Sequence, residues 1–187
     1  IGVRLVGSEM CIRDSGSGAD YTADEDDEQI SASTLVTALA SSNITVRTDG
    51  GGSQDGDIRV SSAISSSSSN DLTLDADNDI IINASVSRTG SGGLVLTTGS
   101  GSVSGSGTIS LGGGSSISSS NGATVENNIS LASGDATFNQ SNAATYSGVI
   151  SGSGNFIKSG LGTVTLSGAN TYCLLYTSDA ADDRCCV

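Results

Sequence analysis

The stretch Tyr146-Ser-Gly-Val-Ile-Ser-Gly-Ser-Gly-Asn-Phe-Ile-Lys-Ser-Gly-Leu-Gly-Thr-Val-Thr-Leu-Ser-Gly-Ala-Asn-Thr-Tyr172 decides the fold of this chain. It contains three short segments of β-branched, aliphatic or aromatic residues, and a glycine-bearing corner ends each of them. Such residues favour strands, whereas glycine allows the chain to change direction. None of the corners is the Asn-Gly or Asp-Gly dipeptide typical of a tight hairpin. The stretch therefore predicts a coiling chain with strands at residues 146–150, 155–158 and 163–166.

Short strand patterns also occur earlier in the chain, at residues 43–47, 57–61, 71–75, 79–83 and 93–97. Four of these five segments alternate strictly between apolar and polar residues, so each strand is expected to have one buried face and one wet face. Their apolar pairs are Ile44 and Val46, Ile58 and Val60, Leu72 and Leu74, and Leu94 and Leu96. Further short segments follow at residues 107–111, 123–125, 128–131 and 136–139.

The spacing of the strands is typical of a solenoid, in which each strand pairs with the equivalent strand one coil later. The interval from Leu72 to Ile80 is 8 residues, and three other intervals are 14 residues: Ile44 to Ile58, Ile58 to Leu72 and Ile80 to Leu94. At about 20 residues per coil and about 4.8 Å between coils, residues 31–172 would form roughly seven coils. Because aromatic residues make up only 3% of the chain, the core is expected to consist of Val, Ile, Leu and Ala.

An acidic segment and one short helical pattern precede these strands. Residues 16–30 carry the run Asp24-Glu-Asp-Asp-Glu28, in which like charges repel, so we expect a solvated acidic linker, with calcium capture as the alternative. Residues 33–40 predict a helix that Ser33 caps and that buries Leu35, Val36 and Leu39.

The stretch 146–172 resembles the autotransporter-associated β-strand repeat of bacterial surface passengers. That repeat reads aromatic-Ser-Gly-x-Ile-x-Gly-x-Gly, then Lys-x-Gly-x-Gly-x-Leu-x-Leu-x-Gly, then Asn-Thr-Tyr. The matching residues are Ser147, Gly148, Ile150, Gly152, Gly154, Lys158, Gly160, Gly162, Leu166, Gly168, Asn170, Thr171 and Tyr172.

A second resemblance lies in the middle of the chain, where residues 72–76 and 79–84 are similar to segments of filamentous haemagglutinin-like exoproteins. Both resemblances imply an all-β, right-handed, single-stranded parallel β-helix at residues 31–172. They also imply a passenger that is secreted to the bacterial cell surface. The implied partners are an outer-membrane translocator and, through the parent protein, a host-cell or matrix glycan or protein receptor.

The charge of the chain excludes one class of partner. Its formal net charge is −13, from 20 acidic and 7 basic residues, and it contains no histidine. A nucleic-acid partner is not expected, because binding phosphates needs a cationic surface. A helix that spans a bilayer needs about 20 consecutive apolar residues, and no apolar run in this chain is nearly that long. We therefore expect no membrane insertion by this segment.

Both ends of the chain differ in composition from its body. All four cysteines lie there, at Cys11, Cys173, Cys185 and Cys186. Residues 1–15 and 173–187 resemble translated sequencing-adapter DNA, so we set both segments aside as artefacts and expect the first to be disordered. The alternatives are a disulfide between the termini, or a metal or redox site at the adjacent cysteines, although no common zinc spacing is present.

Asp75, Asp77 and Asp79 are the best candidates for chemistry. On a straight strand their alternation would place three carboxylates on one side, as a calcium or general-acid site requires. Because Asp77-Asn-Asp79 lies between two strand patterns, we favour a corner in which Asp and Asn bind the backbone. The sequence therefore assigns no catalytic, cofactor-binding or metal-binding residue and predicts no cofactor.

Other polar residues suggest structural or surface roles. Lys158 belongs to the repeat and is expected at a coil corner. The face formed by Thr163, Thr165 and Ser167 permits an ice-binding or glycan-binding function. The asparagines Asn142, Asn155 and Asn170 could instead form polar ladders, stacked inside or along the coils.

These features together predict a structural stalk of a secreted adhesin, which presents binding regions and whose repeat aids export. The alternative function is a carbohydrate-active β-helix enzyme, either a polysaccharide lyase or a glycoside hydrolase.

Overall fold

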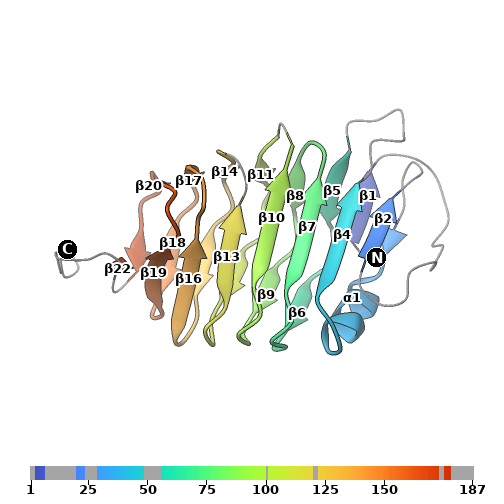
Figure 1. Cartoon of the computed structure of the whole chain (residues 1–187), viewed down its shortest axis with the longest axis horizontal. Helices are drawn as coiled ribbons and strands as arrows, with labels where there is room; N and C mark the ends of the chain where they lie inside the picture. The colour runs from blue at the N-terminus through green and yellow to red at the C-terminus, as the bar shows by residue number, and fades with distance from the viewer. Residues whose placement is uncertain are drawn as a thin grey trace.

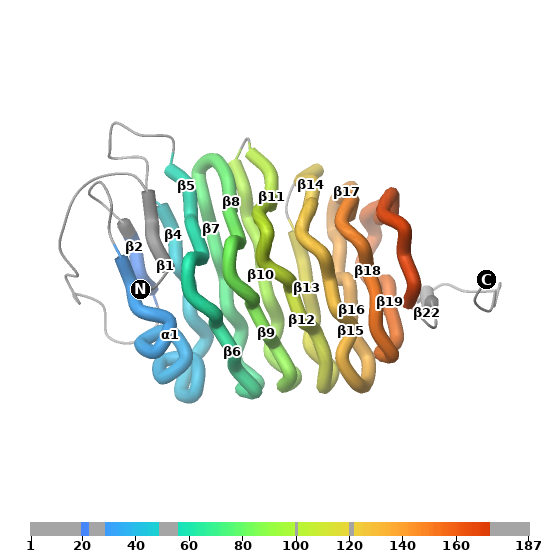
Figure 2. Tube along the Cα trace, turned by 180° about the vertical axis from the view of Figure 1, so that it is seen from behind, coloured from blue at the N-terminus to red at the C-terminus, as the bar shows by residue number. Residues whose placement is uncertain are grey.

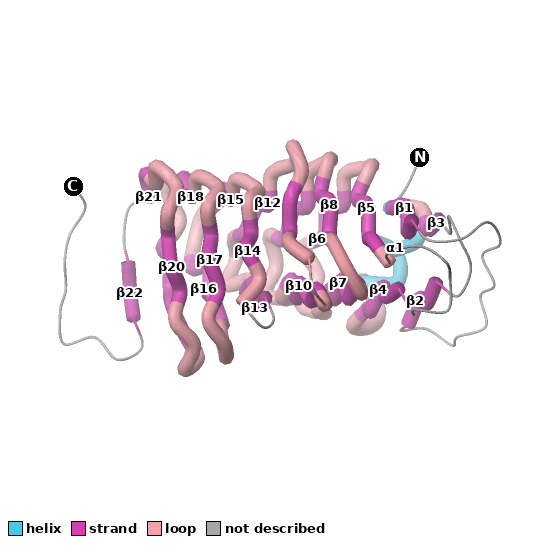
Figure 3. The backbone as a smooth tube through the Cα atoms, turned by 90° about the horizontal axis from the view of Figure 1, so that it is seen from above, coloured by secondary structure: helices cyan, strands magenta, loops and turns pink. Residues whose placement is uncertain are grey.

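The chain folds into a right-handed parallel β-solenoid, a rod of six coils with three strands in each coil (Figure 1). The computed structural model describes residues 3–6, 20–23, 29–48, 56–99, 101–119, 122–172 and 175–177. Each coil contributes one strand to each of three sheets, which run along the rod. Seen from above, the coils stack along one axis (Figure 3).

Sheet 1 faces the viewer in Figure 1. It contains β2 (Asp20–Ala23), β4 (Ile44–Thr48), β7 (Leu72–Ala76), β10 (Leu94–Thr98), β13 (Ser116–Ser119), β16 (Asp135–Asn139), β19 (Asn155–Ser159) and β22 (Leu175–Thr177).

Sheet 2 contains β3 (Gln29–Ile30), β1 (Val3–Val6), β5 (Asp57–Val60), β8 (Ile80–Ile82), β11 (Val103–Ser104), β14 (Thr124–Val125), β17 (Ala144–Tyr146) and β20 (Val164–Leu166). Sheet 3 can be followed in the view from behind (Figure 2). It contains β6 (Ile64–Ser66), β9 (Val86–Arg88), β12 (Ile109–Leu111), β15 (Ile129–Leu131), β18 (Ile150–Gly152) and β21 (Thr171–Tyr172). We number the coils from the N-terminal end, so that coil one consists of β4, β5 and β6, and coil six consists of β19, β20 and β21.

Alternation of side chains places apolar residues inside the rod, in columns that cross from coil to coil. In sheet 1 the column Ile44, Leu72, Leu94, Ile117 and Phe138 is in register, and each of these side chains is at most 1% exposed. Each coil by itself buries only a few side chains, so neighbouring coils stabilise one another by sharing this core.

Aromatic residues add a stack at the C-terminal end of the core. The ring centroids of Phe138 and Phe156 lie 4.1 Å apart, and those of Phe156 and Tyr172 lie 5.3 Å apart. Tyr146 meets Phe138 edge-on at 5.1 Å. The aliphatic core that the composition predicts therefore holds for coils one to four, and the last two coils add rings.

The structure corrects the predicted number of coils and one strand. Leu72 pairs with Ile44, 28 residues earlier, and Leu94 pairs with Leu72, 22 residues earlier, so the first coils are longer than the predicted length and six coils replace the predicted seven. The 14-residue intervals after β5 and β8 conceal the strands of sheet 3, β6 and β9. Residues 147–149, predicted as part of a strand, form the corner between β17 and β18.

The helix α1 (Ala32–Leu39) begins earlier than predicted, because the capping residue is Ser31 and not Ser33. The Ser31 hydroxyl accepts the backbone N–H of Thr34 at 3.0 Å. Leu35 and Leu39 are fully buried, whereas Val36 is only partly buried. The helix contacts β6 and β4, at the N-terminal end of the rod (Figure 2).

Two predictions for the N-terminal segment also need correction. Strands β2 and β3 lie within the predicted linker, and β2 pairs in parallel with β4; the acidic run 24–28 lies outside the described residues. Strand β1 lies within the segment expected to be disordered and pairs antiparallel with β5 and β3. Without β1, the side of β5 that faces away from β8 would have unpaired backbone groups, and β1 pairs with them. The Val-Arg-Leu-Val sequence of β1 suits a strand.

Replacing an inward side chain should destabilise the rod far more than replacing its outward neighbour. We expect Leu96→Ala to lower the free energy of unfolding by about 2–5 kcal/mol, because the fully buried Leu96 side chain leaves a cavity. Val95→Ala, on the outer face of the same strand, is the matched control and should cost less than about 1 kcal/mol. Urea titrations followed by circular dichroism measure both; similar costs for the two variants would contradict the inward assignment.

Candidate functional site

The three predicted carboxylates do not share one face of a strand. Asp75 lies on the outer face of β7, and its carboxylate lies 3.7 Å from the Arg47 guanidinium of the preceding coil. Asp77 and Asp79 lie in the corner between β7 and β8. The prediction of a corner is therefore confirmed.

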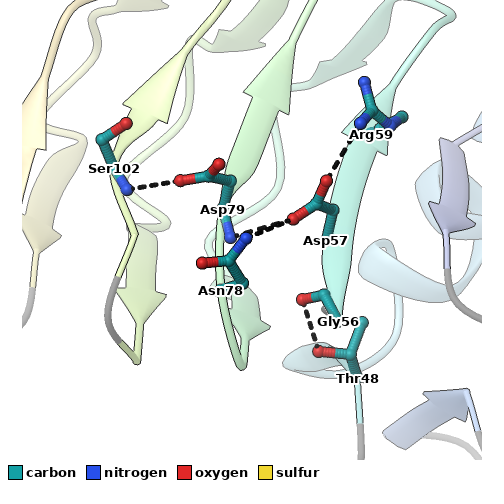
Figure 4. A network of polar contacts seen from close by, with 7 residues as sticks. All are labelled: Thr48, Gly56, Asp57, Arg59, Asn78, Asp79 and Ser102. Carbon is teal, nitrogen blue, oxygen red and sulfur yellow. Dashed lines mark hydrogen bonds and ion pairs between the residues drawn. The ribbon is translucent and has the colours of Figure 1, made fainter. Parts of the chain in front are cut away.

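Hydrogen bonds along the rod axis occupy the side chains of Asn78 and Asp79 (Figure 4), whereas Asp77 contributes its backbone N–H, which donates to Thr48 Oγ1 at 2.9 Å. Asp79 Oδ1 accepts the backbone N–H of Ser102, in the next coil, at 2.7 Å. One coil earlier, Asp57 Oδ1 accepts the backbone N–H of Asp79 at 3.2 Å and the Asn78 side-chain amide at 3.0 Å. The other oxygen, Asp57 Oδ2, accepts a charge-assisted bond from Arg59 at 2.9 Å. Each carboxylate therefore binds a backbone donor of the coil that follows it.

The same contact recurs at other corners, where a side-chain oxygen of Asp or Asn accepts a backbone N–H from the adjacent coil. We call these contacts the axial caps. Besides the two above they are Asn43 to Asp71 N at 3.0 Å, Asp71 to Gly93 N at 2.6 Å, Asn128 to Val149 N at 3.0 Å and Asn170 to Ile150 N at 2.8 Å. The caps satisfy backbone donors at corners, where the ladder of the sheets is interrupted.

Glycine is required where two coils approach closely at a corner. A Cβ atom at Gly101 would lie 2.2 Å from Asp79 Oδ1 and would displace the cap. Gly152 has φ +120°, and a Cβ atom there would lie 2.1 Å from the carbonyl oxygen of Leu131. Gly152 is the last residue of β18, so glycine there lets the end of this strand lie against Leu131 of the preceding coil.

Calcium binding and the paired-carboxylate chemistry of glycoside hydrolases both need carboxylates that converge. Among the described residues, no group of three or more His, Cys, Asp or Glu side chains is placed to hold a metal ion. The acidic run 24–28, the other calcium candidate, lies outside the described residues, as do the four cysteines.

The predicted polar ladders and corner contacts are found in part. Asn170 forms an axial cap, and Asn155 donates from its amide to Asp135 Oδ1 at 2.8 Å. Asn142 is an exposed corner residue. Lys158 lies in β19 rather than at a corner, but its amine donates to the corner carbonyl of Gly160 at 2.5 Å.

Hydroxyl groups form columns on the outside of the rod. On sheet 2, Thr165 is in register with Thr145 and Thr124, whereas Thr163 and Ser167 flank strand β20. A longer column, which the sequence analysis missed, crosses all six coils of sheet 3: Ser65, Ser87, Ser110, Ser130, Ser151 and Thr171.

Several polar side chains are buried inside the rod, and the sequence patterns did not predict them. Gln140, in the orientation that satisfies its amide, donates to the Ser119 carbonyl at 2.9 Å and accepts from the Tyr146 hydroxyl at 2.5 Å. Burial raises the pKa of Tyr146, because its ionised form would lose hydration. Asn127 donates to the carbonyl oxygens of Ile82, Gly105 and Gly107. These hydrogen bonds satisfy the Gln140 amide and the Asn127 amide nitrogen, whereas Asn127 Oδ1 has no hydrogen-bond partner.

Comparison with protein-family models, with curated proteins and with solved structures finds no match to this chain. Within the described part of the chain, no helix is long and apolar enough to cross a membrane.

The axial caps predict a clear order of stability among variants of the acidic residues. We expect Asp79→Ala to lower the free energy of unfolding by about 1.5–3 kcal/mol, because the N–H of Ser102 loses a charged acceptor. Asp79→Asn keeps an oxygen at the same place and should cost about half as much. Thermal melts in the presence of EDTA measure both.

The control for the Asp79 variants is Asp75→Ala, which removes only a half-exposed ion pair worth about 0–1 kcal/mol. Added calcium should leave the melting temperatures of the wild type and of all three variants unchanged. A melting temperature that rises with calcium in the wild type and not in Asp79→Ala would contradict the structural role of Asp79.

Proposed function

We propose that this chain is a stalk segment of a secreted bacterial cell-surface adhesin of the autotransporter type. In this role it presents binding regions carried elsewhere in the parent protein, and it aids export. The observation that carries the proposal is the continuity of the rod: parallel pairing and one buried core run through all six coils.

Continuity along one axis suits a spacer. Six coils at a spacing of about 4.8 Å extend the chain by about 29 Å. A force along the axis acts on every interface between coils in turn, and each interface has paired backbone groups and a shared apolar column. Length and stiffness then depend on the number of coils, and no single residue is indispensable.

The outer surface agrees with a passive role. In coils three to six, the described charged residues are few and well separated: Glu126, Asp135 and Lys158. Acidic residues are more abundant in coils one and two, where Asp57, Asp71 and Asp79 form axial caps and Asp75 pairs with Arg47. A carbohydrate-active enzyme would need such carboxylates free to meet a substrate.

The proposed partners follow from the proposed class. The chain would cross the outer membrane through a translocator, and the parent protein would bind a host-cell or matrix receptor. The repeat at residues 146–172 would fold outside the cell and hinder backward movement, since its core continues through the Phe138, Phe156 and Tyr172 stack.

An in-register deletion of one coil tests the stalk proposal. Removing residues 72–93 joins Asp71 to Leu94, and Leu94 occupies the register of Leu72. The deletion also removes Asp75, Asp77 and Asp79. We expect the shortened chain, displayed on cells through an outer-membrane translocator, to keep its β-type circular dichroism and to present a fused binding domain as the full chain does.

Two further arms complete the display experiment. Deleting residues 146–172 should lower surface display, measured with an external protease, because the repeat that aids export is lost. The full displayed chain should release no products from a panel of acidic and neutral polysaccharides. Product release that the 72–93 deletion abolishes would overturn the stalk in favour of the enzyme.

A further inference from the structure

Arg88 is a cation in the interior of the rod. It is the last residue of β9, in register with Ser66 of the first coil and Leu111 of the third, and its side chain is fully buried. The equivalent inward positions in coils three and four are occupied by leucine, Leu111 and Leu131. A leucine at this position would fill the apolar core equally well, so core packing does not explain the arginine.

The protein satisfies the Arg88 guanidinium only in part. Nη2 donates to the carbonyl oxygen of Asn70, whereas Nε and Nη1 have no hydrogen-bond partner. A guanidinium carries five N–H donors, and it stays charged in proteins. Nearby polar groups are engaged elsewhere: the Ser66 hydroxyl bonds to Ser68, and the Asn70 amide donates to the carbonyl of Leu39.

The positive charge of Arg88 is also incompletely balanced. Among the described residues, the ion pairs are Arg47 with Asp75 and Arg59 with Asp57, and neither includes Arg88. Asp71 attracts the guanidinium from a distance, while its Oδ1 caps Gly93. Burial lowers the pKa of Arg88 by more than this attraction raises it. An uncompensated buried charge is expensive, so a further negative group beside the guanidinium would stabilise the folded chain.

The backbone around Arg88 leaves room for the guanidinium. A Cβ atom at Gly92 would lie 2.4 Å from Nη2, so any other residue at this corner would displace the arginine. Two features of the sequence, an arginine in an apolar column and a glycine beside it, therefore create one buried donor site.

We propose that Arg88 binds a small monovalent anion, of the size of chloride, at the free donors of its guanidinium inside the rod. The anion supplies both the missing acceptor and the missing negative charge, whereas a water molecule would supply only the acceptor. Because the anion binds the folded chain and not the unfolded chain, it stabilises the rod between coils one and three.

The test measures the melting temperature of the full chain in chloride and in gluconate, a bulky organic anion, at constant ionic strength. Chloride replaces gluconate stepwise, and we expect the melting temperature to rise by about 3–6 °C for each tenfold increase in chloride above its dissociation constant. The melting temperature in gluconate alone should be the lowest of the series. Arg88→Met should lose this dependence. Arg59→Met, which removes a half-exposed arginine of the neighbouring coil, is the matched control and should retain it.

A second measurement does not depend on the folding of any variant. Crystals of the wild-type chain grown in bromide should show an anomalous peak within about 3.5 Å of a guanidinium nitrogen of Arg88. A water molecule at that place would overturn the proposal, as would equal melting temperatures in chloride and gluconate.

Discussion

Parallel hydrogen bonding between equivalent strands of successive coils is the interaction on which the rest of the structure depends. It aligns residues 20 to 23 positions apart in the second to fifth coils, as between Leu72 and Leu94 or Phe138 and Lys158. Once this register holds, alternation along each strand directs aliphatic side chains into one continuous interior and hydroxyl groups into outer columns. A slip of one residue would exchange the two sets, and the buried core opposes it.

The same register explains why three acidic residues of the first two coils have structural roles. Corners interrupt the backbone ladder, and their N–H groups need acceptors from the adjacent coil. Asp57, Asp71 and Asp79 provide them, so carboxylates that could suggest a catalytic or metal site in the sequence instead hold coils together. The short spacing of Asp77 and Asp79 reflects the geometry of a corner, whereas Asp75 belongs to the strand before it.

The fold was predictable because aliphatic pairs such as Leu72 and Leu74 alternate with polar residues without hairpin dipeptides between them. The strands of sheet 3 were harder to recognise, since Ile64-Ser-Ser66 and Val86-Ser-Arg88 offer a single aliphatic residue each. The corner position of Asp77 and the capping role of Asp79 could be anticipated from their place between two strand patterns. Arg88 could not, because sequence patterns treat arginine as exposed, and only the register places it inside. The axial caps connect residues 20 to 28 positions apart, which local patterns do not relate.

Distances between spin labels on the outer column of sheet 3 test the central claim, that equivalent residues of successive coils stack in register along one axis. Labels at Ser87 and Ser130 are separated by two coil steps, and labels at Ser87 and Thr171 by four. The account predicts that electron–electron dipolar spectroscopy gives about 10 Å for the first pair and about 19 Å for the second, an increase of about 4.8 Å per coil. Distances that fail to grow with the number of coils would contradict the stacked register.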